Sequence, residues 1–304
     1  MVNVPEGDTV LRTARRLHAA LAGRVLLRTE LRWPTLGDVD LAGRTVSEVA
    51  AYGKHILTRL DGMGDLEPVT LRSHLRMEGR WSIAPPGPEH WPRATGVSVR
   101  AVLANAEWTA IGTWLGLLDL VPTAAEAALI GHLGPDVMAD TFVPGGREEA
   151  VRRLAEQPGR PIGAALLDQT AVAGIGTMYM AEVLFVQRIS PWTDTAEVDL
   201  PTVLDVARRL LLRGVMMALP TTTGDPRSGS NTFVHGRSGK PCRRCGAVLR
   251  VAPIGIPPKE RTAFYCPVCQ PGPTPTDDGR VRRPLGATPA VREDRRPLGY
   301  RRNT

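Results

Sequence analysis

The first pattern along the chain is a set of apolar residues at helical spacing. Five residues share one face of a helix drawn through this segment: Val10, Leu11, Ala14, Leu17 and Leu21. Asp8 precedes them as a candidate N-cap, and Gly23 follows them as a stop signal. The pattern therefore predicts an amphipathic helix over residues 9–22.

From residue 24 to about residue 120 the pattern changes to short β-rich runs. The runs are Arg24–Leu31, His55–Leu60, Val69–Leu75 and Val97–Leu103. Turn-forming residues separate them, including Asp61-Gly62 and the proline-rich stretch 85–88. Many short strands divided by glycine and proline are typical of a sandwich or barrel. We expect an N-terminal β-sandwich domain over residues 5–130, with the helix leading into it.

Helical patterns return after Leu133–Asp136, which we interpret as a hinge. The predicted helices are Arg147–Glu156, Pro161–Gln169, Thr177–Gln187 and a long one from Pro201 to about Met217. Gly174 and Gly176 lie between the second and third helices, in a turn whose N–H groups can hold a phosphate. The alternative is a plain packing corner between helices. We expect a helical domain over residues 140–222, followed by a mobile polar loop at 221–232.

All four cysteines of the chain form two pairs within residues 242–269. They are Cys242, Cys245, Cys266 and Cys269, in two Cys-x-x-Cys motifs. Such spacing predicts one tetrahedral Zn²⁺ in a zinc finger over residues 233–270, and four ligands make the site structural. A module this small depends on its metal for folding energy. Two disulfides, the alternative, would require an oxidising compartment.

Charge is unevenly distributed along the chain. The net charge is +7 over the whole chain. Residues 1–232 carry 23 basic and 26 acidic side chains, residues 233–270 carry seven and one, and residues 271–304 carry eight and four. The basic C-terminal part indicates a phosphate-bearing partner or, alternatively, a solvated basic surface. The tail 271–304, rich in proline, glycine and arginine, is expected to be disordered.

The sequence also limits where the protein acts. No uncharged apolar run reaches the roughly 18 residues that a membrane-spanning helix needs, so no membrane partner is expected. Glu6 and Asp8 argue against a secretory leader. We expect a cytoplasmic protein.

Five short motifs follow one another in the chain: Pro5–Asp8, Gly53-Lys54, His74–Gly79, Leu167–Tyr179 and Cys242–Cys269. Together they resemble the motifs of the formamidopyrimidine-DNA glycosylase / endonuclease VIII family of base excision repair enzymes. The resemblance implies an α+β fold with a β-sandwich, a helix–two-turn–helix domain and a zinc finger. It also implies a bacterial, nucleoid-associated and monomeric DNA glycosylase/AP (apurinic/apyrimidinic) lyase that acts on damaged double-stranded DNA. The start of the chain favours the endonuclease VIII branch, whose usual substrates are oxidised pyrimidines.

The resemblance assigns catalytic roles to Pro5, Glu6, Lys54 and Arg261. An N-terminal proline is a secondary amine with a pKa near neutrality. It can attack C1′ of the damaged nucleotide, form a Schiff base and drive β,δ-elimination of the phosphates. Glu6 would shuttle protons. Lys54, one of only three lysines, and Arg261 would bind phosphates beside the lesion, although each could be an ordinary surface cation.

Seven further residues are expected to contact DNA: Arg76, Met77, Glu78, Gly174, Gly176, Thr177 and Arg237. Met77 would fill the hole that the extruded base leaves, unless it is a core methionine. Two residues depart from the family pattern: Thr177 stands where Asn is typical, and Glu78 where some relatives have an aromatic residue. The stretch between the cysteine pairs is long, with Ile254–Pro258 as the expected insertion.

The start of the chain conflicts with this chemistry. Met1–Val4 precede Pro5, and a proline inside a peptide bond has no free amine. We expect residues 1–4 to be an extension, with Val4 as the true initiation position and Pro5 exposed by removal of its methionine. The alternatives are an 8-oxoguanine/formamidopyrimidine-type glycosylase, an inactive damaged-DNA-binding protein with Pro5 blocked, and a zinc-ribbon protein that binds RNA or protein.

Overall fold

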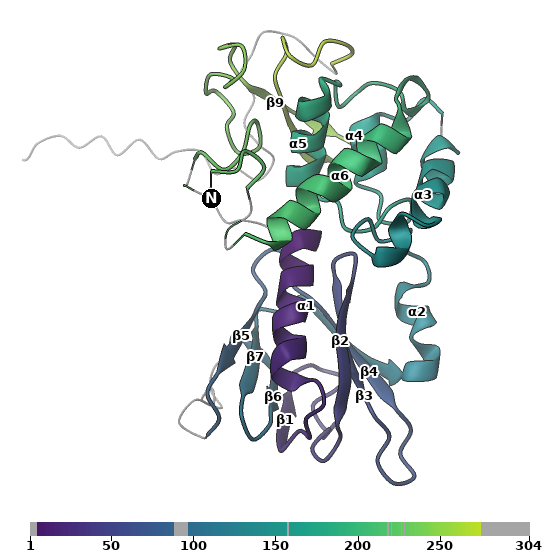
Figure 1. The fold of residues 1–304 in the computed structure, drawn as a ribbon, viewed down its shortest axis with the longest axis vertical. Helices are drawn as coiled ribbons and strands as arrows, with labels where there is room; N and C mark the ends of the chain where they lie inside the picture. Colours follow the sequence, from purple (N-terminus) through teal and green to yellow (C-terminus); the bar gives the residue numbers. More distant parts are fainter. Residues whose placement is uncertain are drawn as a thin grey trace, which may run out of the picture.

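The computed structural model describes residues 5–87, 97–156, 158–217, 219, 221–225, 227 and 229–274. They form a β-rich lobe and a helical lobe, with helix α1 (Gly7–Leu21) running from one to the other (Figure 1). The expected extension at residues 1–4 and most of the expected disordered tail lie outside the described residues.

The β-rich lobe is a sandwich of two antiparallel four-stranded sheets. Their orders are β1-β6-β7-β5 and β2-β3-β4-β8. The strands are β1 (Arg28–Leu31), β2 (Val46–Tyr52), β3 (His55–Leu60), β4 (Val69–His74), β5 (Arg80–Ala84), β6 (Val99–Ala104), β7 (Thr109–Thr113) and β8 (Leu117–Pro122). Leu17 and Leu21 of α1 share one core with Leu31 of the first sheet and Leu60 of the second. The N-terminal helix therefore belongs to the sandwich.

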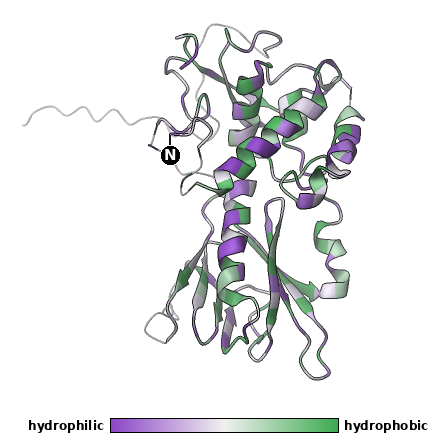
Figure 2. Cartoon of the chain, viewed as in Figure 1, coloured by the Kyte–Doolittle hydropathy of each residue, from purple (hydrophilic) through white to green (hydrophobic). Residues whose placement is uncertain are grey.

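The helical lobe is built around one almost wholly buried helix. Its helices are α3 (Gly146–Ala155), α4 (Ile162–Leu166), α5 (Thr177–Gln187) and α6 (Leu200–Val215), whereas the short helix α2 (Ala127–Ile130) lies beside the β-rich lobe, where Arg72 of β4 donates to the carbonyl of Leu129. Every residue of α5 from Met178 to Phe185 is buried. By contrast, hydrophobic and hydrophilic residues alternate along α1 and α6 (Figure 2). The buried face of α1 packs in the core of the sandwich, and that of α6 packs in the core of the helical lobe. In the described part of the chain, no helix has the length and hydropathy to cross a membrane.

The cysteine-containing module is attached to α5. Strands β9 (Arg250–Ile254) and β10 (Arg261–Tyr265) pair as an antiparallel hairpin. Phe264 of this hairpin packs in one cluster with Val234 and with Phe185 of α5. The structure thus confirms the predicted α+β class, with an N-terminal β-sandwich, a helical second lobe and a four-cysteine module.

Candidate active site and nucleic-acid interface

The carboxylate of Glu6 lies on the N-terminus of α5. Its Oε2 atom accepts hydrogen bonds from the N–H groups of Gly176 (2.9 Å) and Tyr179 (3.2 Å), and its Oε1 atom from Met178 (2.7 Å). These donors would otherwise be unpaired at the start of the helix. Only 3% of Glu6 is exposed. The arrangement joins the residue before α1 to the helical lobe.

This position changes the acidity of Glu6. Burial raises its pKa from 4.5 to about 7, against the opposing effects of the Lys54 charge and of the hydrogen bond from Met178. A carboxyl group with such a pKa exchanges its proton near neutral pH, as a proton shuttle must.

The N–H groups of the turn before α5 are bound by oxygen atoms of the protein itself. Gly174 has a φ of 106°, which favours glycine. Its N–H donates to Gln169 Oε1 (3.1 Å), and the N–H of Gly176 binds Glu6. These two N–H groups therefore bind protein oxygens, and the phosphate contact expected from them is not available. Thr177, the first residue of α5, remains half-buried.

Pro5 directly precedes a fixed helix start. The Glu6 carbonyl accepts the N–H of Val10 (3.0 Å), and the Gly7 N–H donates to the carbonyl of Gly174 (3.1 Å). A Cβ atom at residue 7 would lie 2.8 Å from the same carbonyl oxygen. The backbone that carries Pro5 is therefore held closely against the turn before α5.

The turn between β2 and β3 brings Lys54 to the same place. Gly53 has a φ of 57° and donates its N–H to Asp136 Oδ2 (2.9 Å), while Asp136 Oδ1 accepts from Met138 (2.9 Å). Burial lowers the pKa of Lys54, and the Arg261 charge lowers it further, whereas the Glu6 charge raises it. Among the described residues, no hydrogen bond or ion pair occupies the Lys54 ammonium. It remains available to an anion.

A buried pair that the motifs did not reveal supports this centre. The Tyr179 hydroxyl donates to Asp8 Oδ2 (2.9 Å), and both side chains are buried. A Cβ atom at Gly214 of α6 would lie 2.1 Å from that hydroxyl. The Asp8–Tyr179 hydrogen bond therefore joins α1 to α5, and the absence of a side chain at Gly214 lets α6 approach both. Tyr179 also binds Glu6 through its N–H, so this packing supports the position of Glu6.

The expected wedge residues form the turn between β4 and β5. Arg76, Met77 and Glu78 are all exposed, and the 58% exposure of Met77 excludes a core position. Trp114, in the turn between β7 and β8, is a further candidate wedge residue that the sequence motifs did not indicate. Its φ is 52°, and the residue is 47% exposed. The Gly116 N–H donates to the carbonyl of His74 (2.9 Å), which joins the two turns.

The two arginines assigned to DNA binding occupy different environments. Arg261 is exposed at the start of β10. Arg237 is only 7% exposed, and its guanidinium donates to the carbonyls of Phe233 (2.6 Å) and Pro241 (3.0 Å). Arg237 therefore stabilises the segment before the first cysteine pair, and this use of its donors argues against the expected phosphate contact.

The four cysteines meet at one point. Their sulfur atoms all lie within 4.8 Å of one another, with Cys242 and Cys269 at 3.9 Å and Cys245 and Cys266 at 3.5 Å. Four thiolates about 2.3 Å from a tetrahedral zinc would be separated by about 3.8 Å. The cluster therefore fits a single metal ion, and none of its cysteines is in a disulfide.

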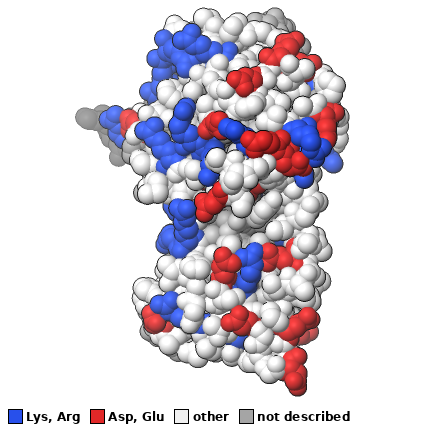
Figure 3. All heavy atoms as spheres, turned by 45° about the vertical axis from the view of Figure 1, so that its right-hand side comes forward, with Lys and Arg blue, Asp and Glu red and all other residues white. Residues whose placement is uncertain are grey.

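Positive charge is concentrated on the cysteine-containing module, where residues 233–270 carry seven basic side chains and one acidic side chain. On the face in Figure 3, clusters of Lys and Arg lie on the upper part of the molecule with Asp and Glu beside them, while the lower lobe carries scattered charges of both signs.

Sequence comparisons give two matching family profiles. The Formamidopyrimidine-DNA glycosylase N-terminal domain matches residues 4–110, and the Formamidopyrimidine-DNA glycosylase H2TH (helix–two-turn–helix) domain matches residues 133–223. The chain is 43% identical to a probable endonuclease 8 2 of Streptomyces coelicolor over 91% of this chain and 98% of the relative. It is 37% identical to DNA-(apurinic or apyrimidinic site) lyase Nei2 of Mycolicibacterium smegmatis, over 88% and 99%.

Structure comparison finds the same fold in DNA complexes. The Lactococcus lactis formamidopyrimidine-DNA glycosylase bound to DNA with an AP site superposes with a TM-score of 0.69 at 24% identity, over 88% of this chain and 100% of the other. A MutM complex with DNA containing carbocyclic 8-oxoguanine gives 0.69 at 23% identity, with the same coverage. At these identities the likeness concerns the fold.

Proposed function

We propose that this chain, which belongs to the formamidopyrimidine-DNA glycosylase family as its motifs predict, is a bifunctional DNA glycosylase/AP lyase of base excision repair. Relatives named endonuclease 8 and DNA-(apurinic or apyrimidinic site) lyase support an enzyme of this kind. The observation that carries the proposal is the position of Glu6. It follows Pro5 directly, is buried on the N-terminus of α5, and has a pKa of about 7.

In the proposed reaction, the amine of Pro5 attacks C1′ of the damaged nucleotide. The glycosidic bond breaks with its electron pair on the departing base, which takes up the proton that the Pro5 nitrogen loses after bonding to C1′. Glu6 in its neutral form protonates the ribose ring oxygen as the sugar opens, and its carboxylate then accepts protons in later steps. The resulting iminium acidifies C2′–H, so the two phosphates leave by β- and then δ-elimination. Water finally releases the sugar fragment from Pro5.

The remaining residues hold the DNA. Lys54 and Arg261 are proposed to bind phosphates beside the extruded nucleotide, since the charge of Arg261 acts on Lys54 across the site. Met77 and Arg76 are proposed to enter the space that the base leaves. Zn²⁺ is the metal that four thiolates at this spacing favour, and it would hold the hairpin that carries Arg261.

The proposal requires a free amine at Pro5, so residues 1–4 must be absent from the active form. We further propose a monomer that acts in the cytoplasm at the nucleoid. Oxidised pyrimidines are the proposed substrates, since the 43% and 37% identical relatives carry endonuclease 8 and Nei2 names. An 8-oxoguanine-type specificity is the second candidate, because a Formamidopyrimidine-DNA glycosylase of Paracoccus denitrificans is 32% identical over 89% of this chain.

A panel of end-labelled duplexes tests the function. One duplex carries an oxidised pyrimidine, a second carries 8-oxoguanine, and a third is undamaged. We expect cleavage of the first duplex to leave phosphates on both sides of the gap, and no cleavage of the undamaged one. Preferred cleavage of the second duplex would support the second candidate. Binding to damaged DNA without any cleavage would indicate a protein that has lost catalysis.

A further inference from the structure

The segment between the two lobes, residues 134–138, is bonded to the turn before α5. Ala173 in that turn donates its N–H to the carbonyl of Pro135 (3.0 Å), and its own carbonyl accepts the N–H of Val137 (3.1 Å). Asp136 and Ala173 therefore pair as a parallel β-bridge. The segment that the sequence pattern suggests is a hinge is thus fixed to the helical lobe by two backbone hydrogen bonds.

The same segment is also bonded to the β-rich lobe. Tyr52, the last residue of β2, donates its hydroxyl to the carbonyl of Gly134 (3.0 Å). The next residue, Gly53, donates its N–H to Asp136 Oδ2 (2.9 Å). Because these bonds come from two consecutive residues, they hold the turn between β2 and β3 at two points. Lys54 follows directly in that turn.

The side chain of Asp136 connects the turn to the segment between the lobes. Asp136 is only 5% exposed, and it uses both carboxylate oxygens, Oδ2 for the N–H of Gly53 and Oδ1 for the N–H of Met138 (2.9 Å). Arg208 of α6 donates to the two carbonyls on either side of Met138 (2.7 and 2.8 Å). The carboxylate is therefore attached to a firmly held backbone, and it holds the turn in place from there.

The turn between β2 and β3 also packs directly on the turn before α5. A Cβ atom at Gly53 would lie 2.8 Å from the Cβ atom of Ala173 and 3.4 Å from the nitrogen of Gly174. The carbonyl of Gly174 accepts the N–H of Gly7, the residue that follows Glu6. The turn and the backbone that carries Glu6 therefore contact the same short segment.

Lys54 has no contact of its own that would fix its ammonium, which makes no hydrogen bond or ion pair with the described residues. Its position therefore depends on the backbone of the turn. We propose that Asp136 is a positioning residue that holds Lys54 in place relative to Glu6. The inference rests on the proposed function, in which Lys54 binds a phosphate, and adds to it the residue that aims this contact. A cation that is already in place binds its anion without a further ordering cost.

Asp136→Asn in the full zinc-loaded chain tests this proposal. The amide oxygen can accept one of the two N–H groups, whereas the NH2 group opposes the other, so one of the two bonds is lost. We expect the Kd for a duplex with a non-cleavable abasic analogue to rise about tenfold, as for the loss of one charge-assisted contact. Removal of a carboxyl group cannot weaken the attraction to DNA through charge, so weaker binding would indicate lost positioning.

A double-mutant cycle separates this role from a general loss of structure. In a Lys54→Gln background, Asp136→Asn should change the Kd by less than about twofold, because the contact that it positions is already absent. In an Arg261→Gln background, Asp136→Asn should keep its effect of about tenfold. A variant that merely destabilised the protein would weaken binding equally in both backgrounds.

Tyr52→Phe is a second and milder test of the same attachment. It removes the hydroxyl that binds the Gly134 carbonyl and keeps the aromatic ring. Binding should weaken in the same direction but by less, and only when Lys54 is present. Hydrogen–deuterium exchange should rise in peptides covering residues 50–56 of both variants, since both release the turn.

Asp194→Asn is the matched control. Asp194 also accepts two backbone N–H groups, those of Gly159 (3.0 Å) and Ala196 (2.9 Å), but it has no bond to the turn between β2 and β3. This variant should match wild type in binding and in exchange. Thermal melting shows whether each variant is folded, and Tyr52→Phe decides the outcome if Asp136→Asn does not fold.

Unchanged binding by a folded Asp136→Asn variant would overturn the proposal, as would an equal loss with and without Lys54. If the wild type bound the abasic duplex no better than an undamaged one, the proposed function would fail. The role of Asp136 would then be judged by exchange in residues 50–56 alone, and unchanged exchange there would overturn it.

Discussion

The carboxylate of Glu6 and the backbone of Gly176 are in such close contact that no side chain fits between them. The Gly176 N–H donates to Glu6 Oε2 at 2.9 Å, and a Cβ atom on residue 176 would lie 2.3 Å from Glu6 Cδ. The φ of Gly176 is −124°, which any residue adopts, so the requirement for glycine is one of space alone. One contact therefore fixes both the proposed proton shuttle, Glu6, and the start of α5.

Replacing Gly176 with Ala should displace the Glu6 carboxylate. We expect base excision to fall by about 100-fold, because displacement of a catalytic group by about 1 Å has effects of this size. Overpacking should cost about 1–3 kcal/mol of stability. Gly37→Ala is the control, because the nearest atom to its added Cβ is 3.9 Å away. Single-turnover rates and chemical denaturation measure both effects, and a Gly176→Ala enzyme with wild-type rates would contradict this role.

Protonation of Glu6 should make stability depend on pH. The folded protein holds this proton up to a pKa of about 7, whereas the unfolded chain loses it near 4.5. The unfolded state therefore binds fewer protons in this range, and the free energy of unfolding falls as the pH rises from about 4.5 to about 7. Glu6→Gln removes this contribution. Denaturation of wild type and variant across the range should give a shallower decline for the variant, and parallel curves would contradict the raised pKa.

Neutralising Lys54 or Arg261 should weaken the dependence of DNA binding on salt. Each phosphate contact contributes about 0.9 to the slope of log K against log salt concentration. Lys54→Gln and Arg261→Gln should each reduce the slope by about this amount on a duplex with a non-cleavable abasic analogue. Arg147→Gln is the control, since Arg147 on α3 is paired with Glu148 and Asp205. A slope unchanged by both test variants would show that neither residue contacts a phosphate.

Removing the metal should unfold the cysteine-containing module. We expect one zinc per chain, and chelation should disrupt the cluster in which Cys266 packs with Phe185 and Phe264. Elemental analysis and near-ultraviolet circular dichroism before and after chelation measure this change. DNA binding should weaken in parallel, because the hairpin of Arg261 is lost. A chain that contains no metal and still binds DNA would contradict the zinc assignment.

Local patterns predicted the elements whose own sequence is distinctive. Helix α5 and strand β3 have the predicted bounds, and α1 lies within two residues of them. The predicted strand Arg24–Leu31 is shortened to Arg28–Leu31, because its first half makes only irregular contacts, such as the bridge between Val25 and Thr45. Strands β2, β5, β7 and β8 are not among the predicted runs. These differences arise where tertiary pairing, not local preference, decides the structure.

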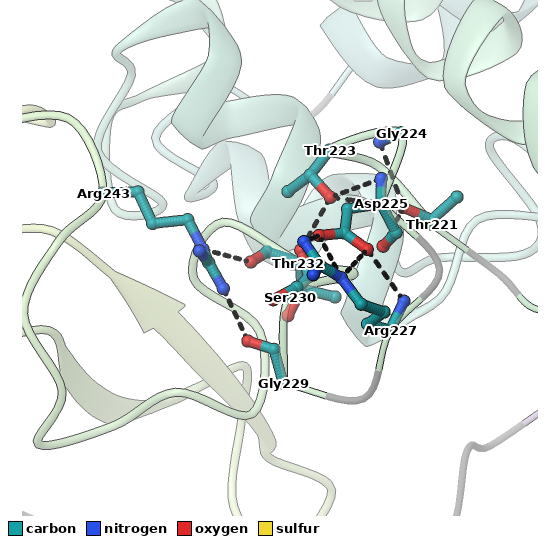
Figure 4. A network of polar contacts seen from close by, with 9 residues as sticks. All are labelled: Thr221, Thr223, Gly224, Asp225, Arg227, Gly229, Ser230, Thr232 and Arg243. Atoms are coloured by element: carbon teal, nitrogen blue, oxygen red, sulfur yellow. Dashed lines mark hydrogen bonds and ion pairs between the residues drawn. The ribbon is translucent and has the colours of Figure 1, made fainter.

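The candidate site could likewise be predicted only in part from local sequence. The glycine pair indicated a turn with outward N–H groups, but nothing local indicated that Glu6, 170 residues away, would occupy the N–H of Gly176. The polar composition of 221–232 suggested mobility, yet Thr222 binds Glu182 and Gly229 binds Arg243 (Figure 4), and both of these partners lie outside the segment. Motif spacing predicted the candidate catalytic residues, whereas their supporting contacts depend on the fold.

Borohydride trapping on a duplex with an abasic site tests the central claim most directly. Two forms of the chain are compared, one that begins at Pro5 and one that retains residues 1–4. The form that begins at Pro5 should give a covalent protein–DNA adduct, with the DNA attached to the Pro5 nitrogen in peptide mass analysis, and the longer form should give none. Equal trapping of the two forms, or attachment at a lysine in place of Pro5, would contradict the account.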